Sequence, residues 1–239
     1  MTAEGPAKSL KNATTTTRSP RLRGQFANLV RFIVNGRKCK RLFDIGFSLS
    51  VLILGFPIYL ILALFIALSS PGPIFYVQQR VGKDYKPFRC FKFRTMVCNA
   101  DEVLAELFAR YPELKQEFEE TYKLKKDPRI TKIGKFLRLT SLDELPQFLN
   151  VLKGDMSVVG PRPLVPDELR YYGRHMAKVL TVKPGITGLW QVSGRNDLPY
   201  ERRIHLDVYY AGQRTMMLDW FIIFKTVGII LFPRNNGAY

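Results

Sequence analysis

The sequence predicts an α+β protein that is mainly helical and associated with a membrane. We expect a re-entrant helical hairpin, a small β-hairpin and interfacial helices around a cytosolic core. Three observations lead to this prediction. Residues 45–79 contain no charged side chain, two aromatic and β-branched segments then flank a turn, and the remaining chain is basic with apolar residues at helical spacing.

The composition allows one sizeable core and favours polyanionic partners. With 46% apolar content in 239 residues, we expect a single domain with appendages. Lys and Arg outnumber Asp and Glu by 37 to 20, which indicates nucleic acid, an anionic membrane face or phosphorylated substrates. Cys39, Cys90 and Cys98 show no C-x-x-C spacing, so we interpret them as free thiols in a reducing compartment and disfavour a thiolate metal site.

Three regions are predicted along the chain. Residues 1–39 form a basic, largely disordered tail with a candidate interfacial helix at 25–34, and no apolar stretch typical of a secretory signal opens this tail. Residues 40–79 form the re-entrant membrane helix. Residues 80–239 form a cytosolic domain with a second candidate interfacial helix at 216–232, whose charges argue against a second span. Either interfacial segment could equally be a core helix.

The uncharged segment is long enough to cross a bilayer, but its flanking charges argue against a crossing. Ile45–Leu68 exceeds the ~20 residues that a spanning helix needs. Lysines and arginines stand on both flanks, so the positive-inside rule places both ends in the cytoplasm. Pro57 lacks the N–H of a continuous helix, and a bend there would return the chain to the face it entered from. The alternative is a tilted transmembrane helix with a proline kink.

The soluble part begins with two elements whose signals are local. Segments PIFYVQQRVG (73–82) and FRCFKFRTM (88–96) flank the turn-like KDYKP and predict a β-hairpin. Residues 99–124 carry charged and apolar side chains at helical spacing. They predict a surface helix that is broken near Tyr111-Pro112.

Two adjacent carboxylates, Asp143 and Glu144, stand where a further helix is predicted to begin. Its apolar residues repeat at helical spacing and Gly154 ends it. Ser141 and Glu144 fit a capping box, in which neither acid need do chemistry. Pro146 is awkward one residue past the first turn of such a helix, so its first residue stays open.

Cations on both sides of the acid pair suit a phosphorylated substrate. Arg138 precedes the pair, and Arg162 follows it in a proline-fixed loop. Arginine forms bidentate contacts with phosphate, and free N–H groups at a helix N-terminus attract phosphate oxygens. Two neighbouring acids can divide the work, because one can attack phosphorus while the other holds a Mg²⁺ that neutralises a diphosphate.

Several long motifs occur in an order that resembles one protein family. They are KRLFD, SSPGPIFYVQQRVG, FKFRTM, LRLTSLDELPQFLNVLKGDMSVVGPRP and KPGITGLWQVSGRN, and the match runs from Lys40 to the C-terminus. The chain resembles the bacterial sugar transferases, or monotopic phosphoglycosyl transferases. It looks most like the short undecaprenyl-phosphate galactose phosphotransferases of exopolysaccharide synthesis. The resemblance implies a re-entrant membrane helix, a cytosolic catalytic core and Mg²⁺ as cofactor.

The resemblance also implies roles for individual residues. Asp143 matches the nucleophile that forms a covalent phosphosugar intermediate, and Glu144 matches its metal-associated partner, so both are expected metal ligands. Basic residues of the phosphate-binding site are matched by Lys92, Arg138 and Arg162. Further substrate-binding residues are expected in the last motif: Lys183, Gln191, Arg195 and Asn196. A glycine-rich loop that packs on a tryptophan would explain this motif nearly as well.

The implied reaction transfers a hexose 1-phosphate from a UDP-sugar, with galactose favoured and glucose next, to undecaprenyl phosphate and releases UMP. Expected partners are the UDP-sugar, undecaprenyl phosphate and membrane lipids, with no nucleic acid and with a homodimer as a further option. We expect the bacterial inner membrane, a catalytic part that faces the cytoplasm, and a short form without an N-terminal membrane bundle. Two alternatives stay open: direct attack by the lipid phosphate, and a non-catalytic scaffold that binds anionic lipids.

Overall fold

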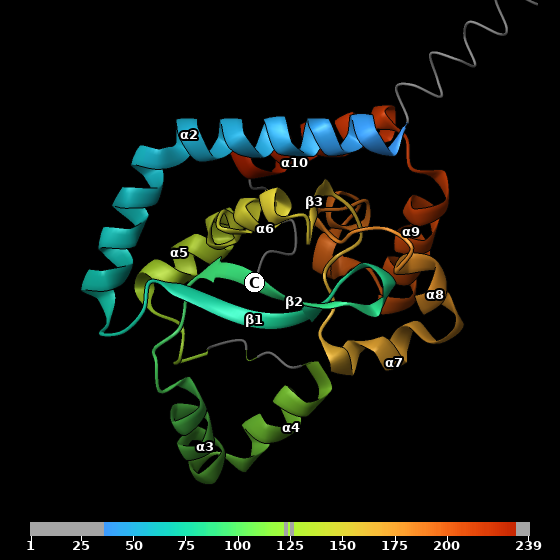
Figure 1. Cartoon of the computed structure of the whole chain (residues 1–239). Helices are drawn as coiled ribbons and strands as arrows, with labels where there is room; N and C mark the ends of the chain where they lie inside the picture. The colour runs from blue at the N-terminus through green and yellow to red at the C-terminus, as the bar shows by residue number, and fades with distance from the viewer. Residues whose placement is uncertain (1–35, 122–123, 125–126, 233–239) are drawn as a thin grey trace, which may run out of the picture.

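The computed structural model describes residues 36–121, 124 and 127–232. The predicted tail, with its candidate interfacial helix, lies outside these residues except for its last few positions. The described chain is mainly helical, as predicted, and it contains two small sheets, of which the prediction included only the β-hairpin (Figure 1). The helices are α2 (Arg37–Ser69), α3 (Ala100–Arg110), α4 (Pro112–Thr121), α5 (Lys132–Thr140), α6 (Gln147–Lys153), α7 (Leu169–Tyr172), α8 (Met176–Val179), α9 (Tyr200–Gln213) and α10 (Met216–Leu231). The strands are β1 (Phe75–Val81), β2 (Pro87–Phe93), β3 (Ser157–Val159) and β4 (Gly185–Thr187).

The uncharged segment forms most of α2, which is one continuous helix with Pro57 inside it. Figure 1 shows α2 sharply bent, with its first limb beside α10 and its second limb descending toward α5. Proline has no N–H to bond the carbonyl of Ile53, and this missing bond favours a bend within the helix. The structure therefore has a single bent helix, and its re-entrant path through a membrane stays a prediction.

Both limbs of α2 pack against the same globular part. On the first limb, Phe43 and Phe47 cover the core cluster that contains Phe148. On the second limb, Leu62 and Ile66 are buried in a cluster with residues of β2 and α5. The two ends of the bent helix are thus tied to one body.

The predicted β-hairpin is confirmed. β1 and β2 pair antiparallel, with Phe75 opposite Phe93 and Val81 opposite Pro87. Asp84 and Tyr85 in the connection have φ values of 55° and 61°. This left-handed geometry makes the tight turn that KDYKP predicts.

The two surface helices α3 and α4 meet at the predicted break. Tyr111 ends α3, and Pro112 is the first residue of α4, a position where a missing N–H costs nothing. Phe108 and Phe118 hold the two helices together with ring centroids 5.5 Å apart. Figure 1 shows this pair of helices below the β-hairpin, on the side away from α10.

The central helix α6 ends where the sequence predicts. Gly154 has φ of 94°, and its N–H bonds the carbonyls of Asn150 and Val151. This left-handed position favours glycine. The chain then enters β3, which pairs in parallel with β4, and the main core gathers around α6, β3 and α10.

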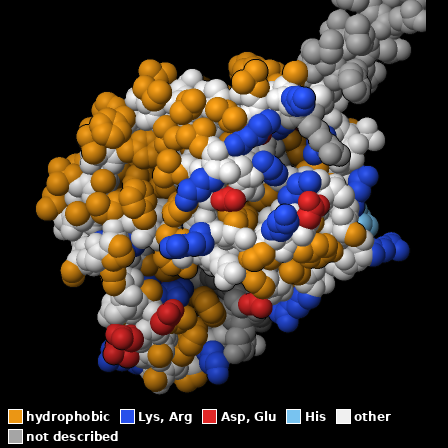
Figure 2. All heavy atoms as spheres, viewed as in Figure 1, with side chains coloured by type: hydrophobic (Ala, Val, Ile, Leu, Met, Phe, Trp, Pro, Cys, Tyr) orange, Lys and Arg blue, Asp and Glu red, His pale blue; other side chains and the backbone are white. Residues whose placement is uncertain are grey.

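One described helix, Lys38–Ser69, is long and apolar enough to cross a membrane, and most of its residues are exposed. Figure 2 shows hydrophobic side chains gathered over α2, with Lys and Arg spread below them across the centre of the same face. Exposed apolar surface of this extent marks a membrane or partner contact. The second predicted interfacial helix, α10, also exposes large apolar side chains, among them Met217, Phe221 and Phe224.

Candidate active site

The acid pair lies in a turn between two helices. Asp143 and Glu144 belong to a short 3₁₀ turn that follows α5 and precedes α6. Ser141 has φ of 58°, caps the end of α5, and donates its N–H to the Arg138 carbonyl. The capping-box interpretation is therefore wrong, because the Ser141 N–H is already used within α5 and the Glu144 carboxylate points to a lysine.

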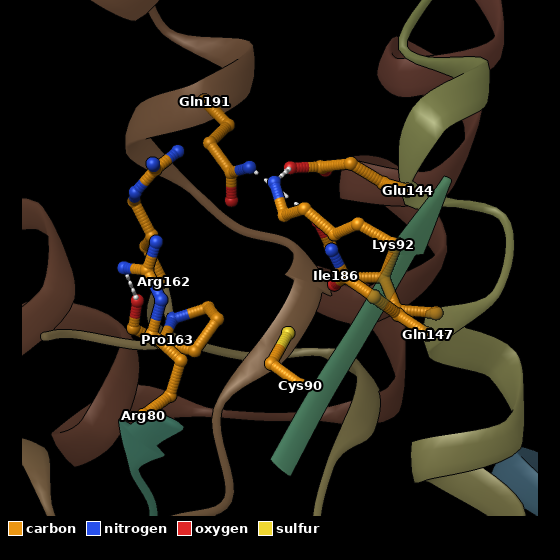
Figure 3. Close-up of a pocket in the computed structure, with 9 residues that line it drawn as sticks. All are labelled: Arg80, Cys90, Lys92, Glu144, Gln147, Arg162, Pro163, Ile186 and Gln191. Carbon is orange, nitrogen blue, oxygen red and sulfur yellow. Dashed lines mark hydrogen bonds and ion pairs between the residues drawn. The ribbon is translucent and has the colours of Figure 1, made fainter. Parts of the chain in front are cut away.

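Lys92 on β2 bridges the two acids. Its Nζ lies 2.8 Å from Glu144 Oε1 and 3.8 Å from Asp143 Oδ2, and Figure 3 shows the contact with Glu144. The lysine and both carboxylates are mostly buried. A partly desolvated cation between two acids lowers the repulsion that would otherwise raise the pKa of one of them.

Two contacts hold β2 against the segment that carries the acids. The buried amide of Asn150 on α6 donates to the Arg89 carbonyl at 2.7 Å and accepts from the Phe91 N–H at 3.0 Å. Beyond the end of β2, Gly134 on α5 lies so close that an added Cβ would overlap the Thr95 carbonyl. These contacts place Lys92 beside a turn that is 52 residues away in sequence.

The two acids differ in how well their charges are compensated. Burial raises the pKa of Asp143 to about 6, although the Lys92 ammonium opposes this shift. Burial acts in the same direction on Glu144, but Lys92 and Arg162 outweigh it and hold the pKa of that carboxyl below its usual value. Glu144 is thus the charged partner of Lys92. Asp143 accepts no hydrogen bond from another side chain in the described part of the chain.

Arg138 supplies a second cation beside Asp143. It extends from α5, and its Nε donates to Thr95 Oγ1 at 3.0 Å. Burial lowers the pKa of Arg138, and the Asp143 carboxylate opposes that shift because the two charges lie close together. Lys92 and Arg138 therefore act on the charge of Asp143 from two different elements, β2 and α5.

A small cavity of about 10 Å³ opens beside Glu144, and we call it the Arg162 cavity (Figure 3). Arg162 reaches it from the loop after β3, and Gln191 reaches it from the 3₁₀ turn Trp190–Val192. Gln191 Oε1 is buried without a hydrogen-bond partner among the described residues. Burying an oxygen without a hydrogen bond costs free energy, so this oxygen is a candidate acceptor for a hydrogen bond from a substrate. The lining residues are Arg80, Cys90, Lys92, Glu144, Gln147, Arg162, Pro163, Ile186 and Gln191.

Sequence reasoning missed several residues of this cavity, among them two with hydrogen-bonding side chains, Arg80 and Gln147. Arg80 counts in the sequence only as a cation on the membrane flank, but its guanidinium is buried and donates to the Pro163 carbonyl at 2.9 Å. It also binds Gln78 Oε1 at 2.6 Å, a contact that strand alternation predicts because residues two apart share a face. Gln147 is almost fully buried, and no local signal separates it from an ordinary first residue of a helix.

The structure places the other predicted substrate-binding residues in different parts of the molecule. Arg195 lies near the acid turn, since its Nη2 donates to Ser141 Oγ at 3.1 Å. Asn196 lies in the same 3₁₀ turn as Arg195, and its side chain is outside the described part. Lys183 is not brought to the acids: it lines a separate cavity with Arg41 from the start of α2. The roles given to these residues stay predictions.

The carboxylates of Asp143 and Glu144 fit a Mg²⁺ site that is completed by a substrate. The described residues contain no group of three or more His, Cys, Asp or Glu side chains that would hold a metal alone. Mg²⁺ is commonly bound by one or two carboxylates together with substrate phosphates, so two adjacent acids suffice. Lys92 already compensates Glu144, and a metal would share that carboxylate with it.

The fold and the site thus define a protein with a long exposed apolar helix and a cation-lined acid pair suited to phosphates. The family model described as bacterial sugar transferase matches residues 35–233. The chain belongs to this family, which confirms the resemblance read from its motifs.

Individual relatives agree with this assignment. The chain is 50% identical over 205 residues to an undecaprenyl-phosphate galactose phosphotransferase of Salmonella typhimurium, covering 86% of this chain and 42% of that protein. It is 41% identical over 227 residues to the exopolysaccharide production protein ExoY of Rhizobium meliloti, covering 95% of this chain and 100% of ExoY. A UDP-glucose:undecaprenyl-phosphate glucose-1-phosphate transferase of Escherichia coli is 40% identical over 214 residues, with 85% and 42% covered. The chain therefore spans less than half the length of some relatives and the whole length of another.

Proposed function

We propose that this chain transfers a hexose 1-phosphate from a UDP-sugar to undecaprenyl phosphate and releases UMP. Galactose is the favoured sugar and glucose the next, because the similar proteins are named for these two substrates. The observation that carries the proposal is the acid pair of Asp143 and Glu144, held between Lys92 and Arg138. The attack of a carboxylate on a diphosphate requires cations around the carboxylate.

In this mechanism an Asp143 oxygen attacks the β-phosphorus of the UDP-sugar. A bond forms between that oxygen and phosphorus, the bond from phosphorus to the bridging oxygen breaks, and UMP leaves with the electron pair. The lipid phosphate then attacks the same phosphorus and releases the Asp143 carboxylate. Lys92 and Arg138 offset the charge that gathers on the phosphoryl oxygens in both steps.

The remaining residues of the site hold the substrate. Arg162 and Gln191 face the cavity beside Glu144 and are placed to bind the donor phosphates and the groups attached to them. Glu144, with Asp143, would hold Mg²⁺, which when bound neutralises diphosphate oxygens. Arg80 positions the loop of Arg162 through its bond to the Pro163 carbonyl.

The bent helix gives this chemistry access to a lipid. Moving a polyprenyl chain into water costs roughly 0.8 kcal/mol per CH₂, so the acids must work at the headgroup plane. Tyr59 on the second limb of α2 donates to the Leu145 carbonyl at 2.9 Å, one residue after Glu144. The packing of both limbs on one body supports a re-entrant helix in the bacterial inner membrane, with the acids on the cytoplasmic side.

The test is UMP release from the purified protein in nanodiscs with Mg²⁺, with a panel of UDP-sugars, and with or without undecaprenyl phosphate. We expect a stoichiometric burst of UMP without lipid and turnover with it. Asp143→Asn should show neither, while Asp167→Asn, which changes an exposed carboxylate on the surface, should match the wild type.

Two outcomes would favour the alternatives. UMP that appears only when lipid is present would favour direct attack by the lipid phosphate, with Asp143 as a metal ligand. No release with any UDP-sugar, from protein whose circular dichroism shows a folded chain, would favour a scaffold that binds anionic lipids.

A further inference from the structure

A second and larger cavity lies away from the acid pair. Its volume is about 260 Å³, and we call it the Lys183 cavity. It is bounded by the start of α2, by β3, by the end of α9 and by the start of α10. Its lining shares no residue with the Arg162 cavity, and the β3–β4 sheet contributes to both: Ile186 to the first, Ser157 and Val159 to the second.

The charges that line the Lys183 cavity do not balance. Its two acids, Asp44 and Asp219, both form ion pairs with Lys40, whose Nζ lies 2.8 Å from Asp44 Oδ1 and 3.0 Å from Asp219 Oδ2. Lys183 and Arg214 also line the cavity, and neither makes an ion pair within the described residues. The cavity therefore keeps a net positive charge after its internal pairs are formed.

Two of its cations converge on one point. A Cβ added to Gly154 would lie 3.5 Å from both Lys183 Nζ and Arg41 Nη2. Arg41 is held in place because it donates to the carbonyls of Val151 and Leu152 at the end of α6. Burial lowers the pKa of Lys183, and the neighbouring charge of Arg41 lowers it further. Like charges this close favour an anion between them.

The cavity also borders the apolar surface. The same helices that line it, α2 and α10, expose Leu42 (72%) and Met217 (85%) within two residues of the lining positions Arg41 and Met216. Trp220, whose ring suits a headgroup region, packs edge-on against Phe43 between these helices. An anion in this cavity would thus have room for an apolar tail along the exposed faces of α2 and α10.

We propose that the Lys183 cavity binds the phosphate of an anionic glycerophospholipid, with Lys183 and Arg214 as its ligands and Arg41 as a fixed neighbouring cation. This inference rests on the membrane association of the chain and not on the transfer reaction. A bound headgroup at the start of α10 fixes the depth of that helix in the bilayer. Lys183 thereby serves the membrane contact rather than the sugar donor.

The test uses the full chain in nanodiscs of phosphatidylcholine, with or without phosphatidylglycerol, followed by native mass spectrometry of the lipids that stay bound. Wild type should retain one phosphatidylglycerol per chain in preference to phosphatidylcholine. Lys183→Gln combined with Arg214→Gln should retain it at least about tenfold less. Lys178→Gln removes an exposed lysine outside the cavity and should retain it as wild type does.

Further arms decide the source of the phosphate and guard against misfolding. Lys183→Arg keeps the charge and should keep the lipid, which a merely unfolded cavity would not do. Saturable thermal stabilisation of the wild type by inorganic phosphate or UMP, lost in the double variant, would overturn the lipid in favour of a soluble ligand. Equal retention of both lipids, or equal loss in Lys178→Gln, would overturn the site. A UMP burst by the wild type in nanodiscs of phosphatidylcholine alone would keep this result separate from the fate of the transfer reaction.

Discussion

Within the described residues, two clusters contain one lysine that bridges two buried acids, and only one of them has the features of a reaction site. Lys92 joins Asp143 and Glu144, while Lys40 joins Asp44 and Asp219. The distances are similar, since each lysine lies within 4 Å of both of its acids. A lysine between two carboxylates is therefore not by itself evidence of catalysis.

The difference lies in how fully the carboxylates are bonded. Asp44 accepts from Ser157 Oγ and the Val158 N–H, and Asp219 accepts from the Tyr210 hydroxyl at 2.7 Å. These bonds tie α2 to β3 and α10 to α9, and the Lys40–Asp219 ion pair ties α2 to α10, so the Lys40 cluster closes the fold. A carboxylate that already accepts short bonds from two or more protein donors has less capacity to bind a substrate, whereas the less bonded Asp143 keeps the capacity to react.

The largest effect is expected at the reactive carboxylate. Asp143→Asn should lower UMP release by at least about 1,000-fold, because the amide cannot act as the nucleophile. The midpoint of thermal unfolding should stay within ~2 °C of the wild type, since no side chain loses a hydrogen bond to this residue. A fall in the unfolding midpoint as large as that of a core variant would show that Asp143 is structural too.

The next effect concerns stability and falls on the other cluster. Asp44→Ala should cost about 3–5 kcal/mol in the free energy of unfolding, because Lys40 and Ser157 lose a buried partner. Urea unfolding measured by circular dichroism checks this value. Asp84→Asn removes the charge of an exposed pair with Lys83, keeps a residue type that tolerates the left-handed φ of 55°, and should stay within about 0.5 kcal/mol. Similar losses in the two variants would contradict the structural role of the Lys40 cluster.

A smaller effect separates the two lysines by pH. The pKa of Asp143 is raised to about 6, so the UMP burst should grow as the pH rises through about 6 and the carboxyl ionises. Lys92→Met removes the charge that opposes the shift and should move this midpoint upward. Lys40→Met should leave the midpoint in place and lower stability instead. A midpoint that is the same in the wild type and Lys92→Met would mean that another group sets the profile.

The smallest effect is expected at a third buried acid that has no lysine. Asp207 accepts from the Tyr172 hydroxyl at 2.9 Å, and burial raises its pKa to about 8. A carboxyl whose pKa is raised on folding stabilises the folded state fully below its unfolded pKa, and this stabilisation is lost as the pH rises from there to about 8. Asp207→Asn should therefore change the free energy of unfolding by less than about 0.5 kcal/mol below about pH 4, where the carboxyl is neutral in both states. As the pH rises to about 8 the variant should become the more stable chain, and a wild type that stays equally stable there would contradict the raised pKa.

The candidate site could be predicted in part. Asp143 and Glu144 are recognisable in the sequence because they are adjacent. The order of the motifs adds Lys92, Arg138 and Arg162. The structure places these three cations around the acids or the cavity beside them. Lys183 belongs to the same motif as Gln191, yet the two line different cavities. Residues close in sequence diverge here because β4 and the turns after it lie between them.

The sequence by itself determined the elements whose causes are local. An uncharged stretch makes α2, Pro112 starts α4, a tight turn makes the hairpin, and Gly154 ends α6, since each depends on the φ values or the polarity of a few neighbouring residues. Only the tertiary structure decided which charges meet. Lys92 reaches Glu144 across 52 residues, and Asp44 reaches Ser157 across 113, because buried charges are placed by the packing of whole elements and not by the residues beside them.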